Sequence, residues 1–457
     1  MVNRFFNNQD GANTRQLRTL LIALYLVGLV VRLAVVLSLG LSPTLDKDEF
    51  EYVNAARSVS RGLGYAIAPQ GTPLESTPRR TAFRMPGPSL MMSVVSSLFG
   101  EDVRWLRLVA VLVNSLSVPL MYFLSRQIMT QQTATEAVSL ELTDSAQSAG
   151  HKVALISALV CAVYPLWIQH SITCKSEPYF IPLLLITHIV VARQARVRTS
   201  SAGLKTGLMW GMLSYVKPYG LPMTVLGAVQ YWWSHRFRKL LPSLAMGLGF
   251  WLMLSPWIYR NYVVFDAFIP LATEGSETFL GTNNPYVFNN PDNHGMWLSP
   301  MEIEEYRLAL EPFPNEIDRA RERKRIAMTD LKSHPEAVPW LALWKLQKMY
   351  SFVSESGFKA SVVVACTWGV LFVLFLIGLL RRTFAFSAEL QLILMWFAMQ
   401  TIVTAVYSSG YSRGRLPLEI LLIPWGLISA RSLWLKYSLT STTFLKTTGF
   451  SRPKREN

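Results

Sequence analysis

The stretch LLIALYLVGLVVRLAVVLSLGL, residues 20–41, decides the fold class. An apolar run of about 20 residues is long enough to cross a lipid bilayer as a helix. Arg15 and Arg18 precede it, and it carries no small-residue cleavage pattern. It is also too long for the core of a signal peptide, so we expect a retained transmembrane helix.

The same pattern recurs along the chain. Of its 457 residues, 51% are hydrophobic and only 16% are charged, whereas soluble proteins are about 25% charged. The sequence therefore predicts an all-α polytopic membrane protein with about ten transmembrane helices. The expected spans lie near 20–41, 105–125, 153–170, 178–192, 203–216, 219–233, 241–259, 359–380, 389–408 and 416–435.

The net charge of +15 comes from basic residues that mostly flank these runs. That placement is typical of membrane proteins, so we expect no nucleic-acid partner. The basic residues gather in the connections that face the cytoplasm if the N-terminus does. This predicts a multi-pass protein of the cell (inner) membrane with both termini cytoplasmic. Cys161, Cys174 and Cys366 lie in or beside apolar runs and indicate no disulfide framework.

Two long connections are predicted on the outer face. Residues 42–104 begin with acidic residues and then hold an apolar stretch, Met85 to Leu98, that is too short to span. It predicts a re-entrant or interfacial helix. Residues 260–358 include a stretch rich in Trp and Lys, which predicts a second interfacial helix. The inner connection 129–150 is polar and predicts a solvated linker.

These segments divide the chain into three parts. Residues 1–259 form a membrane module that includes the outer connection 42–104. Residues 260–358 form an outer-face loop with interfacial helices. Residues 359–457 hold the C-terminal transmembrane helices and a basic cytoplasmic tail.

Several charged residues lie in or next to the expected spans, where a charge is costly unless it has a partner or a function. Arg32 lies inside the first span. Asp48, Glu49 and Tyr52 follow that span and are spaced to share one face of a short helix. The other candidates, all at outer helix ends, are Lys175, Glu177, Arg260, Asn261, Arg413 and Arg415. Each also has a structural alternative, as a snorkelling side chain, an ion pair, a solvated loop or a helix-end anchor.

Together these residues place acidic groups and several arginines on one outer face beside the lipid. Arginine offers forked, always-charged donors to phosphate oxygens, so the pattern predicts a site that handles a lipid phosphate. The chain contains no GxxxxGK[ST], no GxGxxG after a strand, no HExxH and no GxSxG. ATP-driven transport and soluble nucleotide-sugar chemistry therefore have no support.

Six motifs in order resemble the GT-C superfamily of integral-membrane glycosyltransferases. The resemblance is to the group of the protein O-mannosyltransferases and the lipid A aminoarabinose transferases, glycosyltransferase family 39 and its relatives. The motifs are Asp48-Glu49 with Tyr52 and the stretch 56–65, Arg84 to Leu90, Ser176-Glu177-Pro178, Pro256 to Pro285, His334-Pro335, and Arg413 to Pro417.

The resemblance implies a GT-C fold with two outer-face helical loops. It also implies an inverting glycosyltransferase that moves a sugar from a polyprenyl-monophosphate carrier to a protein, lipid or glycan acceptor on the outer face. Asp48 matches the catalytic carboxylate, which would act as the general base, with Glu49 tuning or orienting the site. The arginines that would stabilise the leaving phosphate are Arg84, Arg260, Arg413 and Arg415.

The sequence departs from the aminoarabinose transferases at Arg84, where those proteins have an acidic residue that contributes to a metal site. The same metal site is therefore not expected, although a divalent metal ion on Asp48 and Glu177 stays open as a cofactor. Two other functions also stay open, a transporter or flippase of a polyprenyl-linked sugar and a non-catalytic membrane scaffold. Asp48 discriminates among them, since an enzyme needs its carboxylate and a scaffold would tolerate Asp48→Asn.

Overall fold

The computed structural model describes residues 11–40, 44–69, 74, 78–136, 143–197, 199–234, 240–354 and 357–447. Most of these residues are helical. One short antiparallel ribbon joins β1 (Ala66–Ile67) to β2 (Arg79–Arg80). The chain therefore builds its core from helices packed on helices.

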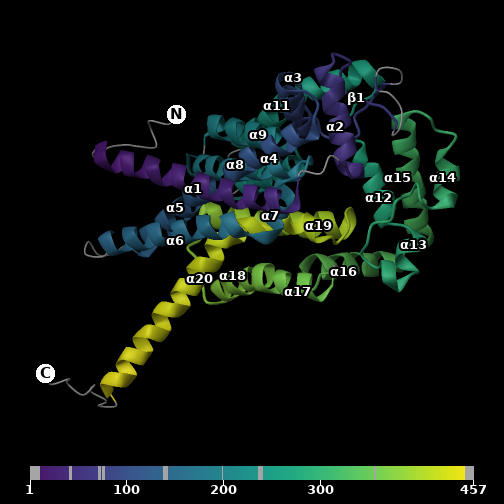
Figure 1. Ribbon diagram of the computed structural model, residues 1–457. Coiled ribbons are helices and arrows are strands. Elements are labelled where there is room, and N and C mark those ends of the chain that lie inside the picture. Colours follow the sequence, from purple (N-terminus) through teal and green to yellow (C-terminus); the bar gives the residue numbers. More distant parts are fainter. Residues whose placement is uncertain are drawn as a thin grey trace.

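Most of the helices run side by side in a bundle (Figure 1). In chain order they are α1 (Gly11–Leu39), α4 (Val103–Ser115), α5 (Ser117–Glu136), α6 (Thr143–Val163), α7 (Pro165–Ser171), α8 (Glu177–Val197), α9 (Ser200–Ser214), α10 (Gly220–Ser234), α11 (Leu241–Phe265), α17 (Phe358–Val364), α18 (Val370–Leu380), α19 (Ala388–Val406) and α20 (Ser412–Thr447). A π-helical turn, Ala365–Gly369, joins α17 to α18.

The other helices gather at one end of this bundle (Figure 1). They are α2 (Lys47–Ser60), α3 (Gly87–Phe99), α12 (Glu274–Thr282), α13 (Pro285–Phe288), α14 (Glu304–Leu310), α15 (Glu316–Ser333) and α16 (Ala337–Tyr350). They come from the two connections that the sequence places on the outer face. We therefore call this end the outer end.

Seven helical segments of the described chain are long and apolar enough to cross a bilayer. The pair α6 and α7, bent by 55°, would form an eighth span. The prediction of an all-α polytopic membrane protein is therefore confirmed. The seven segments are Arg15–Ser38, Val103–Gln132, Glu177–Val197, Leu241–Phe265, Phe358–Leu380, Ala388–Val406 and Arg413–Tyr437.

Two of the expected spans are too short for a full crossing. The runs 203–216 and 219–233 form α9 and α10, which have 15 residues each. At 1.5 Å per residue each is about 22 Å long, less than the ~30 Å of a hydrocarbon core. Glycines allow α9 to pack closely against α11. A Cβ on Gly207 would lie 1.9 Å from the carbonyl oxygen of Met246 in α11.

The connection 129–150 differs from the solvated linker that its polar sequence predicts. Helix α5 continues to Glu136 and α6 begins at Thr143, while residues 137–142 lie outside the described residues. No Gly or Pro occurs between positions 129 and 149, so nothing in the sequence stops either helix early. The basic tail also begins as helix, since α20 extends to Thr447, and residues 448–457 lie outside the described residues.

The two predicted interfacial stretches are helices with apolar exposed faces. In α3, Leu90, Val94 and Leu98 are exposed, although the opposite face packs on α2. In α16, Trp340 and Leu343 are exposed in the same way. Both helices lie at the outer end of the bundle (Figure 1), where an apolar face can enter the lipid.

Candidate active site

Helix α2 brings the first predicted site residues together, and its start is fixed by a capping box. The Asp46 carboxylate accepts the backbone N–H of Glu49 at 2.9 Å, and the Glu49 carboxylate accepts the backbone N–H of Asp46 at 3.2 Å. Two N–H groups that the helix leaves unpaired are thereby satisfied. Asp48 is consequently held in the first turn of α2.

Asp48 lies between two arginines from distant parts of the chain. Its Oδ1 is 2.7 Å from Nη2 of Arg84, and its Oδ2 is 2.6 Å from Nη1 of Arg413. Burial favours the neutral acid, but the two guanidinium groups outweigh it and lower the pKa of Asp48 to about 2. Asp48 is therefore an ionised carboxylate at neutral pH.

Arg84 lies among three carboxylates. Besides Asp48 it contacts Glu51, at 2.7 Å from its Nε, and Glu274, through its Nη1. Burial raises the pKa of Glu51 to about 7 in spite of the arginine beside it. The ring of Tyr52 lies 5.4 Å from the guanidinium carbon and covers one side of it. We call Asp48, Glu51, Glu274 and Arg84 the acidic half of the site.

Glu177, at the start of α8, holds the other side of the site. Its Oε1 accepts Nε of Arg413 at 2.5 Å and Nζ of Lys217 at 2.8 Å. Only 1% of the Glu177 side chain is exposed. Lys175 lies nearby, and its Nζ is 2.5 Å from the Asp46 carboxylate. We call Lys175, Glu177, Lys217 and Arg413 the basic half of the site.

A close backbone contact joins the two halves. The N–H of Gly87, at the start of α3, donates to the Tyr215 carbonyl oxygen at 2.8 Å. A Cβ on Gly87 would lie 2.6 Å from that oxygen, so a glycine is required there. The turn that carries Lys217 is thus fixed to the loop that carries Arg84.

A second set of hydrogen bonds holds the outer segment 260–358 over the loop around Arg84. The Glu316 carboxylate, at the start of α15, accepts the Thr81 hydroxyl, the Ala82 N–H and the Thr273 hydroxyl at 2.7, 3.0 and 2.7 Å. The N–H of Thr273 also donates to the Ala82 carbonyl oxygen at 3.0 Å. Glu274 is placed beside Arg84 by these bonds.

Glu49 is engaged elsewhere, although it is the neighbour of Asp48. Its carboxylate lies 3.0 Å from Nη2 of Arg107 in α4 and accepts the backbone N–H of Cys174 at 2.9 Å. The side chain is 5% exposed. These contacts hold α2 against the bundle. Glu49 can therefore position Asp48 without contacting Arg84 or Arg413.

Two of the predicted arginines bind groups outside the site. Arg260 donates to the carbonyl oxygens of Thr81 and Tyr65, both at 2.7 Å. Arg415 donates to Glu419, one helical turn later, at 2.5 Å, and to two backbone carbonyls at the end of α16. The structure therefore does not bring Arg260 or Arg415 to Asp48.

Asn261 and Arg32 also lie apart from the Asp48 cluster. Asn261 is fully buried, accepts from Arg260 and donates to the Ile269 carbonyl oxygen at 2.9 Å. Arg32 is fully buried between helices, where its Nε donates to Asn114 at 2.8 Å. The costly charge in the first span thus has a polar partner inside the bundle.

The residues present do not fit a divalent metal ion between the carboxylates. The guanidinium of Arg84 fills the space among Asp48, Glu51 and Glu274, and Arg413 bridges Asp48 and Glu177. In the described part of the chain, no group of three or more His, Cys, Asp or Glu side chains is placed to hold a metal. Arg84 and Arg413 thus provide the positive charge next to Asp48.

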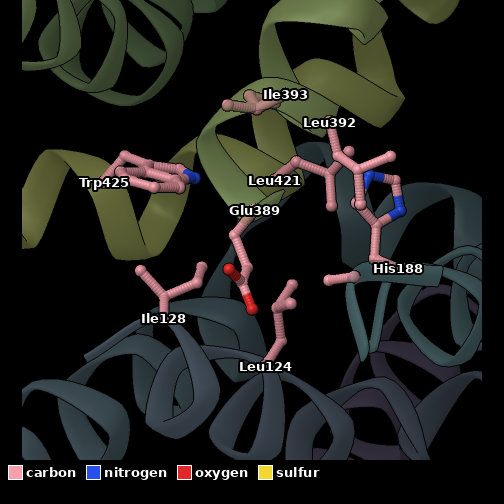
Figure 2. A pocket seen from close by; sticks show the side chains of 9 residues that line it. Leu124, Ile128, His188, Glu389, Leu392, Ile393, Leu421 and Trp425 are labelled. Atoms are coloured by element: carbon pink, nitrogen blue, oxygen red, sulfur yellow. The ribbon is translucent and has the colours of Figure 1, made fainter. Parts of the chain in front are cut away.

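A small pocket, with a cavity volume of about 10 Å³, lies among α5, α8, α19 and α20, away from these residues. Figure 2 shows Glu389 and His188 among its apolar lining. Glu389 accepts a hydrogen bond from Gln127 at 2.9 Å and another from Arg196. This carboxylate therefore ties α19 to α5 and α8, and it contacts none of the groups around Asp48.

Two solved structures of ArnT from Cupriavidus metallidurans are similar to this chain. The structure bound to undecaprenyl phosphate matches 93% of this chain and 79% of its own, with 14% identity and a TM-score of 0.40. The structure in the apo state matches 92% and 78%, with 14% identity and a TM-score of 0.36. No protein-family model and no curated protein matches the sequence.

Proposed function

We propose that this protein is an inverting glycosyltransferase of the GT-C type that uses a polyprenyl-monophosphate sugar as donor. It transfers the sugar to an acceptor on the outer face of the cell (inner) membrane, and both of its termini are cytoplasmic. One observation carries the proposal: an ionised carboxylate, Asp48, pairs with Arg84 of the acidic half and with Arg413 of the basic half at the outer end of a membrane bundle. The undecaprenyl phosphate bound by ArnT belongs to the expected class of carrier.

The two halves suit the two reacting groups of a displacement reaction: Asp48, in the acidic half, suits the attacking hydroxyl, and Arg413, in the basic half, suits the leaving phosphate. The acceptor hydroxyl approaches Asp48 and attacks the anomeric carbon while the bond from that carbon to the phosphate oxygen breaks. The electron pair of this bond leaves with the phosphate, and the hydroxyl proton passes to Asp48. Inversion needs only one carboxylate as base, so a second carboxylate at nucleophile distance is not required.

The ion pairs of Asp48 also explain how a group with so low a pKa can accept a proton. Arg413 contacts both Asp48 and Glu177. When the donor phosphate engages Arg413, one oxygen of Asp48 loses that partner, and the proton affinity of Asp48 rises. Asp48 thus becomes a better base after the donor has bound.

The variant Asp48→Asn tests the proposal. It keeps the shape and polarity of the side chain, although only one of its two arginine contacts can persist, and it removes the ability to accept the proton, so transfer should fall by about 10²–10⁴-fold. The measurement is single-turnover transfer from purified protein in nanodiscs, with a panel of polyprenyl-phosphate hexoses, pentoses and amino sugars. Donor binding, measured in parallel, should change little.

Asp292→Asn is the matched control, because Asp292 is exposed on the outer segment and contacts none of these groups. It should transfer sugar at the wild-type rate. Wild-type transfer by Asp48→Asn would remove Asp48 from the mechanism. Donor movement across the membrane without transfer by the wild type would favour a flippase instead.

A further inference from the structure

Glu274 is the most exposed carboxylate of the acidic half. Its side chain is 36% exposed, against 27% for Asp48 and 15% for Glu51. Its Oε1 accepts a hydrogen bond from Arg84, and its Oε2 accepts none within the described part of the chain. Glu274 is also the one carboxylate of the acidic half that comes from the outer segment 260–358. This segment thus brings an oxygen that a bound molecule can reach.

Asp48 and Glu274 lie next to each other on one guanidinium group. Arg84 donates to Asp48 through Nη2 and to Glu274 through Nη1, and these two nitrogens are bonded to the same carbon atom. The other oxygen of Asp48 is held by Arg413, which engages the donor phosphate in the proposed reaction. Each carboxylate then offers one oxygen. Two hydroxyl groups on adjacent carbon atoms can therefore donate to both carboxylates at once.

The cations of the acidic half are already paired. All three nitrogens of Arg84 donate to carboxylates. Lys47 and Arg323, which come next, lie 3.8 and 2.8 Å from the two oxygens of Glu277. Three carboxylates share Arg84, so a phosphate or carboxylate group on an acceptor is repelled here. An uncharged hydroxyl group, in contrast, finds carboxylate oxygens that can accept its hydrogen bond.

Tyr407, directly after α19, forms an aromatic wall beside Glu274. A Cβ on Gly275 would lie 1.9 Å from the Tyr407 hydroxyl, so a larger residue at position 275 would displace the tyrosine. The ring of Tyr407 stacks on Phe279 of α12, with the ring centres 5.6 Å apart. Burial and the charge of Glu274 raise the pKa of Tyr407 to about 12, so its hydroxyl stays neutral. An apolar ring with a polar edge suits the similarly mixed surface of a sugar.

We propose that the acceptor is an uncharged glycan and that Glu274 binds the hydroxyl group next to the one that attacks. The attacking hydroxyl passes its proton to Asp48, as in the proposed function, on which this inference rests. The neighbouring hydroxyl donates a hydrogen bond to Oε2 of Glu274. A serine or threonine side chain has no second hydroxyl to donate, and an anionic acceptor is repelled. Glu274 therefore determines acceptor specificity and takes no part in the proton transfer.

A panel of acceptors tests this assignment in nanodiscs, with the polyprenyl-phosphate sugars as donors. The panel contains methyl hexopyranosides, each of their monodeoxy analogues, a threonine-containing peptide and a hexose phosphate. The wild type should transfer sugar to a methyl hexopyranoside in preference to the peptide and the phosphate. Loss of the hydroxyl next to the attacking one should lower kcat/KM by at least about tenfold, because a buried carboxylate oxygen is then left without its partner.

The variant Glu274→Ala separates specificity from a structural role. It should use the methyl hexopyranoside and this deoxy analogue with kcat/KM values within about twofold of each other, since neither can bind at position 274. Its KM for the donor should not change, and Arg84 keeps two carboxylate partners. A merely structural role would lower transfer to both acceptors equally. Glu304→Ala is the matched control, because Glu304 is exposed on the same outer segment. It should keep the wild-type preference.

Gly275→Ala serves if Glu274→Ala does not fold. It displaces Tyr407 and should raise the KM for the glycan several-fold without changing the KM for the donor. A wild type that prefers the peptide or the phosphate would overturn the assignment, and so would an unchanged preference in Glu274→Ala. In either case the enzyme stands and the acceptor class is wrong.

The proposed function can fail separately. Binding isotherms with neutral hexose oligosaccharides measure the acceptor site without transfer. If the wild type transfers no sugar but binds these glycans, and Glu274→Ala weakens this binding while Glu304→Ala does not, the glycan site stands and the enzyme does not. Absence of both transfer and glycan binding would reject the acceptor assignment as well.

Discussion

Asp48 and Glu49 are adjacent in the sequence, yet their carboxylates contact different residues. Asp48 bridges Arg84 and Arg413, whereas Glu49 holds Arg107 and the backbone of residue 174. The side chains of neighbouring residues in a helix point about 100° apart, so one of them can face the site while the other faces the bundle.

Glu51 gives the acidic half a measurable pH dependence. Burial raises its pKa to about 7 from an ordinary 4.5, so between these values the folded protein holds a proton that the unfolded chain releases. Stability therefore falls as the pH rises from about 4.5 to 7, by up to about 3 kcal/mol. Asp48, with a pKa near 2, stays ionised in both states over this window.

The variant Glu51→Gln should remove most of this dependence, because a neutral side chain has no proton to lose. Thermal unfolding midpoints of the wild type and the variant, measured in detergent from pH 4.5 to 8, check it. The variant should be the more stable of the two above pH 7. If the unfolding midpoints of the two proteins change with pH in parallel, Glu51 has an ordinary pKa and the prediction is wrong.

The sequence predicts some members of this cluster and misses others for identifiable reasons. Asp48, Arg84, Glu177 and Arg413 belong to motifs at outer helix ends, and the structure brings them together. Arg260 lies at a similar position, but an arginine can equally well bind carbonyl oxygens, and sequence alone does not separate the two uses.

The sequence misses three members of the site, which are Glu51, Glu274 and Lys217. Glu51 lies in the same acidic stretch as Asp48, three residues later in α2. Glu274 and Lys217 join the site only because the chain folds back on itself, over 190 residues in the case of Arg84 and Glu274. For Lys217 the sequence did hold a signal. It is a charged residue in the turn between two unusually short apolar runs.

At the scale of elements, α2 is positioned by Glu49 as much as by its packing. Glu49 completes the capping box and pairs with Arg107, and both residues are less than 10% exposed. Removing one partner of a buried ion pair leaves the other charge uncompensated. The position of the Asp48 carboxylate therefore depends on Glu49, which is not itself the proposed base.

The variant Glu49→Gln should consequently lower the stability of the fold, on the order of 3 kcal/mol. Adding Arg107→Gln should restore part of the loss, since no buried charge is then left alone. Thermal unfolding in detergent measures both. Glu101→Gln is the control, because its partner Arg61 is on the surface, where such pairs contribute little. Equal losses for Glu49→Gln and Glu101→Gln would contradict this role.

The packing of the elements was less predictable than their lengths. The short apolar runs 203–216 and 219–233 already indicate the lengths of α9 and α10. The turn at residues 215–219 separates the two helices, and close glycine contacts join α9 to α11. Such contacts depend on which helices become neighbours, and a single sequence does not record that.

At the scale of the whole molecule, one end of the bundle carries the site. The N-terminal end of α1, the C-terminal end of α5, the N-terminal end of α6 and the C-terminal end of α20 lie at the opposite end (Figure 1). The charge distribution in the sequence predicts that this opposite end faces the cytoplasm.

Cysteine labelling tests this orientation. Ser148→Cys, near the start of α6, should react only after the membrane is opened, and Asn290→Cys, on the outer segment, should react in intact cells. Both positions are exposed. Cys366 is replaced beforehand because it is exposed as well, whereas Cys161 and Cys174 are buried. Labelling of both positions from the same side would reject the topology.

The pairing of Asp48 with Arg413 spans 365 residues, and this distance has a consequence for biosynthesis. The ribosome completes Asp48 and Glu177 long before it reaches Arg413, at the start of the span Arg413–Tyr437. Until that span inserts, both carboxylates lack a cation that α20 supplies. A product that stops before α20 therefore lacks one positive charge at its outer end. The insertion of α20 is the step that completes this cluster of ion pairs.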